Sequence, residues 1–555
     1  MADLFATHKP VLDQALAAIA GRGYWAAYPE MPSGKIYGET AKADAEAAFQ
    51  ALLNKPFALD QPGSGGFGGR ERSPYGLELG ITYPKASVPR LLEAARKAAP
   101  GWAEATPEAR VGVCLEILHR LNRQSFLIAQ AVMHTSGQAF VMAFQAGGPH
   151  AQDRGLEAVA YAYDEMKRVP VRARWEKPAG KGEPLRLDKE FRIVPRGIAV
   201  VIGCSTFPTW NSYPGLFASL ATGNPVIVKP HPGAILPLAL TVKIGREVLK
   251  EAGFDPNVLL LAADLADGET QALVTDPLVA IIDFTGGPAF GRWLEENARQ
   301  AQLFTEKAGI NPVVIDSTDD FEGMCANIAF SLSLYSGQMC TAPQNIFVPR
   351  SGIATDQGHK TFEEVGAGIA RAIDRLLGDP DRAAAVLGAI QSDATWERVQ
   401  KEAAAGEVVH PATPVAIPGF PQARAVTPLV RKVAAAAEET YAEEKFGPIS
   451  FLIATGDTAE SIRRAAAGAS AKGAITAAIY TTDPDVLVAA EKAFAEAGVA
   501  LSENLTGGVF VNQSAAFSDY HVSGANPAGN ACLTDAAFVA NRFRVAMVRR
   551  PAKAA

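Results

Sequence analysis

From Gly197 onward, short apolar runs alternate with stretches of helical periodicity, and this alternation restricts the fold more than any other feature of the chain. The first four runs are IAVVIG, NPVIVKP, NVLLLA and VAIIDFTGG. Runs of this kind are typical of parallel strands buried on both faces, and the segments between them are long enough to cross over as helices. The pattern therefore predicts a Rossmann-type α/β domain.

A second series of apolar runs predicts a second α/β domain: NPVVID, NIFVP, ISFLIA, AITAAIYTT and GVFVN. Two domains also suit the length of 555 residues, which exceeds what one hydrophobic core usually absorbs. We assign the first domain to residues 86–168 and 195–303 and the second to 304–512, followed by a loop and helix region at 513–540. Residues 88–163 show helical spacing, with Pro100 and Gly101 expected to separate two helices.

The remaining segments flank these domains. Residues 1–85 form an N-terminal extension, with a short amphipathic helix at Val11–Ile19 and loops rich in Gly and Pro. Within it, Gly63–Gly68 matches G-x-G-x-x-G by letters, but no strand precedes it and no helix follows, so we expect a flexible loop. Residues 169–194 predict a protruding β-hairpin, and the strand-like tail at 541–555 could pair with the hairpin of its own or another subunit.

Composition excludes several classes of function. With 20% charged residues and a net charge of −7, the chain lacks the positive field that attracts nucleic acid or anionic lipid. It has no basic leader followed by an apolar block, and no apolar run of about 18 residues, so we expect neither export nor membrane insertion. The cysteines are scattered without a C-x-x-C pair, which favours a reducing cytoplasm and no metal site. They are Cys114, Cys204, Cys325, Cys340 and Cys532.

Three residues are candidates for chemistry. Cys340 stands in SGQMCT, between a helical pattern and the strand-like NIFVP, and is either a small buried residue or a nucleophile. Glu306 lies 34 residues upstream in FTEKAGINP, and is either a solvated acid at a strand edge or a general base. Glu444 belongs to a pair of acids that precedes a turn and the strand ISFLIA.

Two further segments combine a strand end with polar or flexible residues. In FTGGPAFG, the glycines Gly286, Gly287 and Gly291 close a strand and open a helix. In NPVIVKP, Lys229 ends another strand. Taken together, in order and in spacing, these segments resemble the aldehyde dehydrogenase superfamily from about residue 88 to the C-terminus.

The resemblance implies a fold and a set of roles. It implies a Rossmann-type cofactor domain at 86–168 and 195–303, a catalytic domain at 304–512, and an oligomerisation element at 169–194 and 541–555. Cys340 would be the nucleophile, near a helix start as in the family, and Glu306 the general base. Lys229 would bind the adenosine ribose, and Gly286, Gly287 and Gly291 would form the cofactor-side turn. Glu444 and Phe446 would hold the nicotinamide ribose and ring.

Three departures from the family pattern matter. The family places an oxyanion-binding asparagine where this chain has Thr206, whereas Asn211 stands five residues later, so either could donate the hydrogen bond. NAD-preferring relatives often carry an acid at the position of Pro232, so we expect NADP or NAD as the cofactor. His231 nearby is either a phosphate contact or an ordinary loop histidine. Lys307 and Ile310 follow Glu306 where relatives have apolar and basic residues, respectively.

Within the superfamily, the chain is most similar to the PaaN-type proteins of phenylacetate degradation. This implies a small-molecule aldehyde substrate, a semialdehyde of aromatic catabolism, possibly CoA-linked, that is oxidised to an acid through a thioester on Cys340. A homodimer or dimer of dimers is also implied. Two alternatives are a CoA-acylating aldehyde dehydrogenase and a weakly active binding protein on the same scaffold, which Thr206 would favour.

Overall fold

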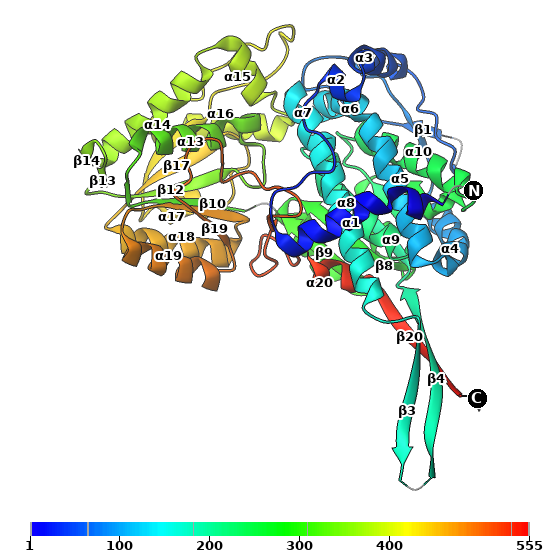
Figure 1. Ribbon diagram of the computed structural model, residues 1–555. Helices are drawn as coiled ribbons and strands as arrows, with labels where there is room; N and C mark the ends of the chain where they lie inside the picture. The colour runs from blue at the N-terminus through cyan, green and yellow to red at the C-terminus, as the bar shows by residue number, and fades with distance from the viewer. Residues whose placement is uncertain (1–2, 64–65, 181, 308, 534, 553–555) are drawn as a thin grey trace.

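The computed structural model describes residues 3–63, 66–180, 182–307, 309–533 and 535–552. It consists of two α/β lobes side by side and a narrow three-stranded sheet that projects from the first lobe (Figure 1). Each lobe is built around one largely parallel sheet with helices on both faces. The predicted fold class is confirmed.

The first lobe contains a five-stranded parallel sheet in the order β7-β6-β5-β8-β9. Its strands are β5 (Ile198–Ile202), β6 (Val226–Lys229), β7 (Leu259–Leu261), β8 (Val279–Gly286) and β9 (Gln302–Lys307). Alternate side chains enter different cores: Val201 packs on one face, while Val200 and Ile202 pack on the other. Burial on both faces explains why these strands are continuously apolar in sequence.

Residue 304, expected to begin the second domain, falls inside β9. This strand pairs with β8 in parallel, with Thr285 opposite Glu306. Glu306 is therefore held by the first sheet, and the chain passes into the second lobe only after β9. The apolar runs did not reveal this strand because QLFTEK is short and mixed.

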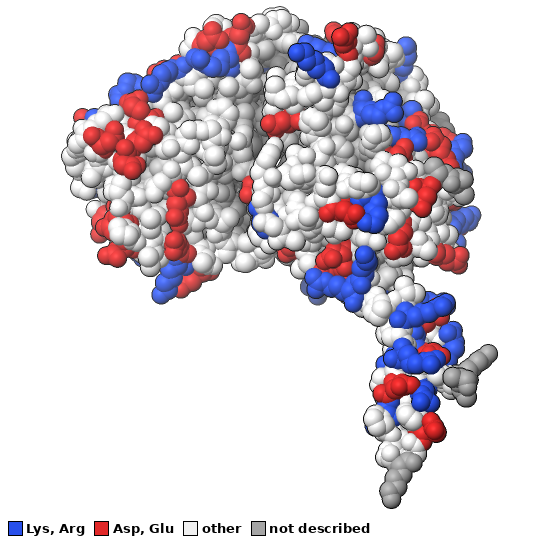
Figure 2. Space-filling model, viewed as in Figure 1, with Lys and Arg blue, Asp and Glu red and all other residues white. Residues whose placement is uncertain are grey.

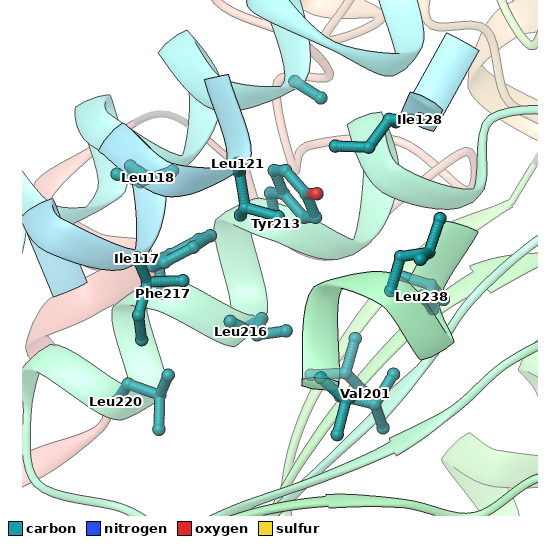
Figure 3. Packing of buried hydrophobic residues seen from close by; sticks show 14 of the residues in the cluster. Ile117, Leu118, Leu121, Ile128, Val201, Tyr213, Leu216, Phe217, Leu220 and Leu238 are labelled. Atoms are coloured by element: carbon teal, nitrogen blue, oxygen red, sulfur yellow. The ribbon is translucent and has the colours of Figure 1, made fainter. Parts of the chain in front are cut away.

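Helices cover both faces of this sheet. On one face, Ile117, Leu118 and Leu121 of α5 pack against Phe217 and neighbouring side chains of α9 (Figure 3). The helices of the lobe are α4 (Val88–Glu104), α5 (Pro107–Arg123), α6 (Ser125–Ser136), α7 (Phe140–Gly147), α8 (Pro149–Lys167), α9 (Pro208–Ala221), α10 (Leu236–Glu251), α11 (Asp267–Thr275) and α12 (Pro288–Asn297).

The break expected at Pro100 and Gly101 is wrong, because α4 continues through both residues to Glu104. An interior proline removes one helical hydrogen bond. The turn beyond it is held by Trp102, whose side chain is buried and donates from Nε1 to the carbonyl of Leu220 at 3.0 Å. Tertiary contact thus overrides the local breaker.

The second lobe contains a seven-stranded sheet in the order β15-β16-β17-β12-β10-β18-β19, parallel except for the β15–β16 pair. Its strands are β10 (Asn311–Ile315), β12 (Pro343–Pro349), β15 (Glu407–His410), β16 (Leu429–Ala434), β17 (Ile449–Thr455), β18 (Thr476–Tyr480) and β19 (Ala500–Glu503). The helices are α13 (Phe321–Ser333), α14 (Phe362–Leu377), α15 (Pro380–Leu387), α16 (Asp393–Ala403), α17 (Glu438–Tyr441), α18 (Thr458–Lys472) and α19 (Pro484–Glu496). A small sheet combines β11 (Ser317–Thr318), β13 (Ile353–Thr355) and β14 (Gly358–Lys360).

The expected strand at GVFVN, residues 508–512, does not form, and β19 takes the edge position instead. Residues 508–512 lie against α13: Asn327 donates to the carbonyl of Val509 at 2.6 Å, and Phe510 stacks on Phe330 with ring centroids 4.0 Å apart. Val511 is buried in the same core as α13, whereas Val509 is exposed. A helix rather than strand pairing thus covers part of this run, and the local sequence pattern does not distinguish the two.

The projecting sheet is formed within one chain. The hairpin β3 (Arg172–Ala179) and β4 (Gly182–Pro195) pairs antiparallel with β20 (Phe543–Pro551), which follows the short helix α20 (Ala536–Ala540). The tip at residue 181 and the tail at 553–555 lie outside the described residues. Acidic and basic side chains are interspersed along this sheet and over the visible face (Figure 2).

The N-terminal extension is more helical than expected, with α1 (Leu4–Gly21), α2 (Gly34–Tyr37) and α3 (Ala41–Leu52). Part of the expected loop at Gly63–Gly68 is a short strand, β1 (Gly66–Gly68), paired with β2 (Tyr83–Lys85); residues 64 and 65 lie outside the described part. Helix α1 packs on α5 and α8. None of the described helices has the length and apolar character needed to cross a bilayer.

Candidate active site

Cys340 lies in a turn between the 3₁₀ segment Leu334–Gly337 and β12. A helix start at Cys340, which the family resemblance implied, is not found. The preceding residues Tyr335, Ser336 and Gly337 have φ angles of 54°, 50° and 61°. This left-handed run ends the helical chain before Cys340 and turns it towards β12. Non-glycine residues rarely adopt this conformation, and such residues concentrate at functional sites.

Hydrogen bonds hold this turn on both sides of Cys340. The amide of Asn311 donates to the carbonyl of Cys340 at 2.8 Å and to that of Ala342 at 2.9 Å. The hydroxyl of Thr341 donates to the carbonyl of Asn512 at 2.7 Å. Asn311 is buried at the start of β10, so an inner strand of the second sheet fixes the backbone that carries the sulfur.

Glu306 reaches the same place from the first sheet. Its side chain is 1% exposed, and its two oxygens accept separate hydrogen bonds. Asn211 Nδ2 donates to Oε2 at 3.0 Å, and His521 Nε2 lies 3.0 Å from Oε1. Ligand atoms of Glu306, Cys340 and His521 all lie within 4.8 Å of one another. Tertiary structure thus brings together a glutamate, a cysteine and a histidine, which are residue types that also bind zinc. The scattered cysteines in the sequence had predicted no metal site.

The surroundings of Cys340 suppress its ionisation. Cys340 is partly exposed and packs against the buried residues Ile475, Val522 and Ala528. Burial raises the pKa of the Cys340 thiol well above its usual value, and the negative charge of Glu306 raises it further. The thiol is therefore protonated at neutral pH in the absence of other ligands, and a thiolate needs a base or a change in its surroundings.

The two candidate oxyanion donors occupy different positions. Asn211, in the first turn of α9, is buried and contacts Glu306 directly. The side chain of Thr206 hydrogen-bonds Cys204, and its carbonyl accepts from Gln138 at 2.8 Å. Burial raises the pKa of Cys204 to about 11. Asn211 therefore belongs to the Glu306 cluster, whereas Thr206 supports the neighbouring loop.

Glu444 and Phe446 lie in the loop before β17, beside the cysteine turn. Burial raises the pKa of Glu444 to about 8, although Arg398 opposes this shift. Arg398 also donates to the carbonyl of Phe446 at 2.5 Å. Gly337 allows the two loops to meet, because a Cβ atom there would lie 2.5 Å from the carbonyl oxygen of Gly447.

The expected cofactor residues lie at the strand ends of the first sheet. Lys229 ends β6 and is 9% exposed; burial lowers its pKa. Gly286 ends β8, and Gly287 precedes the first turn of α12. At Gly291, a Cβ atom would lie 2.6 Å from the side chain of Lys307, so only glycine fits without displacing that lysine. Burial lowers the pKa of His231 to about 4, and Lys229 adds to the effect.

The sequence pattern missed His521, Asn311 and Gln344. Gln344 holds the Glu444 loop, donating to the carbonyl of Glu443 at 3.2 Å. His521 lies in a segment without helical or strand periodicity, Asn311 is the first residue of the predicted strand NPVVID, and Gln344 directly precedes the predicted strand NIFVP. A polar residue at the first position of a buried strand is a signal that could have found Asn311.

Comparison with known proteins decides the family. The model of the aldehyde dehydrogenase family matches residues 81–530. The chain belongs to the aldehyde dehydrogenase family. Its structure superposes on the crystal structure of an NAD-dependent aldehyde dehydrogenase from Burkholderia multivorans with a TM-score of 0.98 and 58% identity, covering 100% of this chain and 99% of that one.

More distant relatives give the same family or fold. N-succinylglutamate 5-semialdehyde dehydrogenase of Pseudomonas fluorescens is 26% identical over 395 residues, which cover 68% of this chain and 74% of the relative. A 1-pyrroline-5-carboxylate dehydrogenase mutant of Thermus thermophilus, at 20% identity, shares the fold with a TM-score of 0.74 and covers 95% and 99% of the two chains. The expectation of an aldehyde dehydrogenase is confirmed.

Proposed function

We propose that this aldehyde dehydrogenase oxidises an aldehyde to a carboxylic acid through a thioester on Cys340. The observation that carries the proposal is the buried Glu306 carboxylate beside the Cys340 sulfur, within 4.8 Å of it. A base at this distance serves hydrolysis of a thioester, since it can take a proton from an attacking water.

Cys340, Glu306 and Asn211 have different roles in the proposed reaction. The Cys340 thiol releases its proton to solvent, and the sulfur bonds to the aldehyde carbon, giving a tetrahedral adduct with a negatively charged oxygen. Loss of hydride from this adduct leaves a thioester. Glu306 then accepts a proton from water as the water oxygen bonds to the thioester carbon, and the C–S bond breaks to release the acid. The Asn211 amide donates to Glu306, and we assign Asn211, with Thr206 as the alternative, to stabilising the oxyanion.

A nicotinamide cofactor, NAD or NADP, supplies the hydride acceptor when it is bound. Several residues fit such a ligand. Lys229 is a buried cation at the end of β6, and the structure shows no ion pair for its ammonium group with a described residue. Gly287 leaves the start of α12 open, with no atom within 4 Å of a Cβ there, whereas a Cβ at Gly286 would lie 2.8 Å from the ring of Phe284. Glu444 and Phe446 are assigned to the nicotinamide ribose and ring. Gly291 is assigned to the cofactor-side turn, where the side chain of Lys307 packs against it.

For the substrate, the similarity to PaaN-type proteins supports a semialdehyde of aromatic catabolism, with or without a CoA thioester. The semialdehyde dehydrogenase among the relatives supports the same substrate class. The runner-up is CoA-acylating oxidation, in which CoA rather than water resolves the thioester. The hydrogen-bonded Glu306 favours water.

The test is an assay of a panel of aldehydes and semialdehydes with NAD and with NADP, monitored by nicotinamide absorbance, and repeated with CoA present. We expect turnover that yields the free acid, and none from Cys340→Ala. Acyl-CoA as the main product would establish the runner-up. Undiminished turnover by Cys340→Ala would refute the covalent mechanism, and a wild type inactive on all substrates would favour a binding protein.

We also propose that the projecting sheet joins subunits into a homodimer or a dimer of dimers. It exposes several large apolar side chains, which are costly to leave in water and typical of contact surfaces. They include Trp175, Leu185, Val194, Val545 and Met547. Analytical sedimentation of the full chain and of a chain lacking residues 541–555 tests this assignment. We expect the truncated chain to form a smaller assembly, and an assembly of unchanged size would contradict the proposal.

A further inference from the structure

His521 is a buried histidine that the reaction described above does not use. Its side chain is 3% exposed, and its Nε2 lies 3.0 Å from Oε1 of Glu306. The ring stands edge-on to the indole of Trp210, with centroids 4.6 Å apart and an interplanar angle of 76°. Trp210 therefore limits where the imidazole can go.

Glu306 is fixed by donors from two elements that are far apart in sequence. Asn211 in α9 donates to one oxygen, and His521 in the C-terminal segment contacts the other. The backbone is held by the same segment, because Glu306 forms a bridge with Gly529 and the amide of Lys307 donates to the carbonyl of Ala528. A carboxylate only accepts hydrogen bonds, so Nε2 of His521 carries the hydrogen when Glu306 is ionised.

The second ring nitrogen indicates that His521 is more than a packing residue. Its Nδ1 is buried and has no hydrogen-bond partner among the described residues. Leaving a buried polar atom unsatisfied costs free energy, and a phenylalanine would contact Trp210 without that cost. The Nε2 contact with Glu306 is the polar interaction that the imidazole adds at this position.

We propose that His521 is a positioning residue that holds the Glu306 carboxylate towards Cys340, in the orientation from which it accepts a proton from water. The proposal rests on the proposed function, because it concerns the hydrolysis of the thioester. The imidazole donates its Nε2 hydrogen to Oε1 and leaves the second oxygen to Asn211, so the base is oriented before the acyl group forms. Precise orientation of a reacting group can change a rate by about 100-fold.

The experiment separates acylation of Cys340 from deacylation. p-Nitrophenyl acetate is an activated ester that acylates a nucleophilic thiol, so the full chain should release a burst of about one p-nitrophenol per site. Slower steady release then reports hydrolysis of the acetyl thioester. We compare wild type with His521→Phe, His521→Met and His521→Gln. Phenylalanine and methionine lack a donor, whereas the glutamine amide can donate to the carboxylate.

For the two donor-free variants we expect the burst amplitude of the wild type and a steady rate about 10- to 100-fold lower. His521→Gln should recover part of the loss.

A matched control is His410→Phe. His410 is a second buried histidine with a carboxylate partner, since its Nε2 lies 3.2 Å from Oδ1 of Asp374 in the outer part of the second lobe. This variant should deacylate like the wild type. Melting temperatures show whether each variant is folded, and having two donor-free variants guards against the misfolding of one.

The possible failures are distinct. A normal burst with unchanged deacylation in His521→Phe or His521→Met would overturn the role of His521 alone. So would equal losses in all three variants, including His521→Gln, because they would indicate a purely structural effect. If the wild type shows no burst and mass spectrometry finds no acetylated Cys340, the proposed function falls, and the role of His521 falls with it.

Discussion

Glu306 and Cys340 meet across the junction of two sheets: the acid ends β9 of the first lobe, and the cysteine precedes β12 of the second, with reacting atoms within 4.8 Å. Neither lobe alone contains both groups. The site therefore depends on how the lobes are joined, and each partner alters the chemistry of the other.

Glu306→Gln should have opposite effects on two reactions of Cys340. Because the charge of Glu306 raises the pKa of the thiol, its removal should shift the pH profile of alkylation by iodoacetamide to lower pH. Aldehyde oxidation should fall by about 100-fold or more, because the base is lost. Glu296→Gln, at an exposed position of α12, is the control. Alkylation that is slower in Glu306→Gln at every pH would contradict this electrostatic relationship.

The free energy of unfolding should depend on pH through Glu444. Its pKa is about 8 in the folded chain against the ordinary value of 4.5, so between these values the folded state holds a proton that the unfolded state lacks. Stability from this group is present at low pH and is lost as pH rises towards and through 8. Glu444→Gln should therefore gain in melting temperature over wild type at about pH 9 and gain less at about pH 5.

The neighbouring acid provides the control for that measurement. Glu443 is exposed and pairs with Lys472 at 2.5 Å, so Glu443→Gln should not show the same gain at high pH. Equal melting differences for Glu444→Gln at the two pH values would argue that its carboxyl titrates normally.

Asn311→Ala should impair both stability and turnover. The side chain donates to the carbonyls of Cys340 and Ala342, and its Oδ1 accepts from the amide of Ile475 at 2.9 Å. Unsatisfied buried backbone groups should lower the free energy of unfolding by about 2–3 kcal/mol, measured by urea denaturation. The burst of p-nitrophenol should also slow as the cysteine turn loosens. Asn297→Ala at the exposed end of α12 should leave both values nearly unchanged, and an unaffected burst in Asn311→Ala would show that the turn is held by other contacts.

Lys229→Met tests the cofactor assignment. If the ammonium binds the adenosine ribose, its loss removes a charged hydrogen bond, and KM for the nicotinamide cofactor should rise about 10-fold or more with kcat largely retained. Lys243→Met is the control, since Lys243 is exposed on α10 and pairs with Glu247 at 2.5 Å. An unchanged KM for both NAD and NADP would remove Lys229 from the cofactor site.

The sequence by itself determined most strands of the two large sheets and the candidate nucleophile and base, although it missed β9 and placed at residues 508–512 a strand that does not form. Continuous apolar runs such as IAVVIG and NPVIVKP identify β5 and β6, because a strand buried on both faces needs apolar side chains at every position. Cys340 and Glu306 were found from their short motifs and their order. The two strands follow from their own residues, whereas Cys340 and Glu306 stand out only through the order and spacing of several motifs along the chain.

Tertiary structure decided which groups act together. The partners of Glu306 are 95 and 215 residues away in the chain, at Asn211 and His521, and no periodic pattern links residues so far apart. The same applies to Pro100, which stays within a helix held by Trp102, and to GVFVN, part of which packs on α13 instead of joining a sheet. Local sequence sets which side chains must be buried, whereas long-range packing sets what they are buried against.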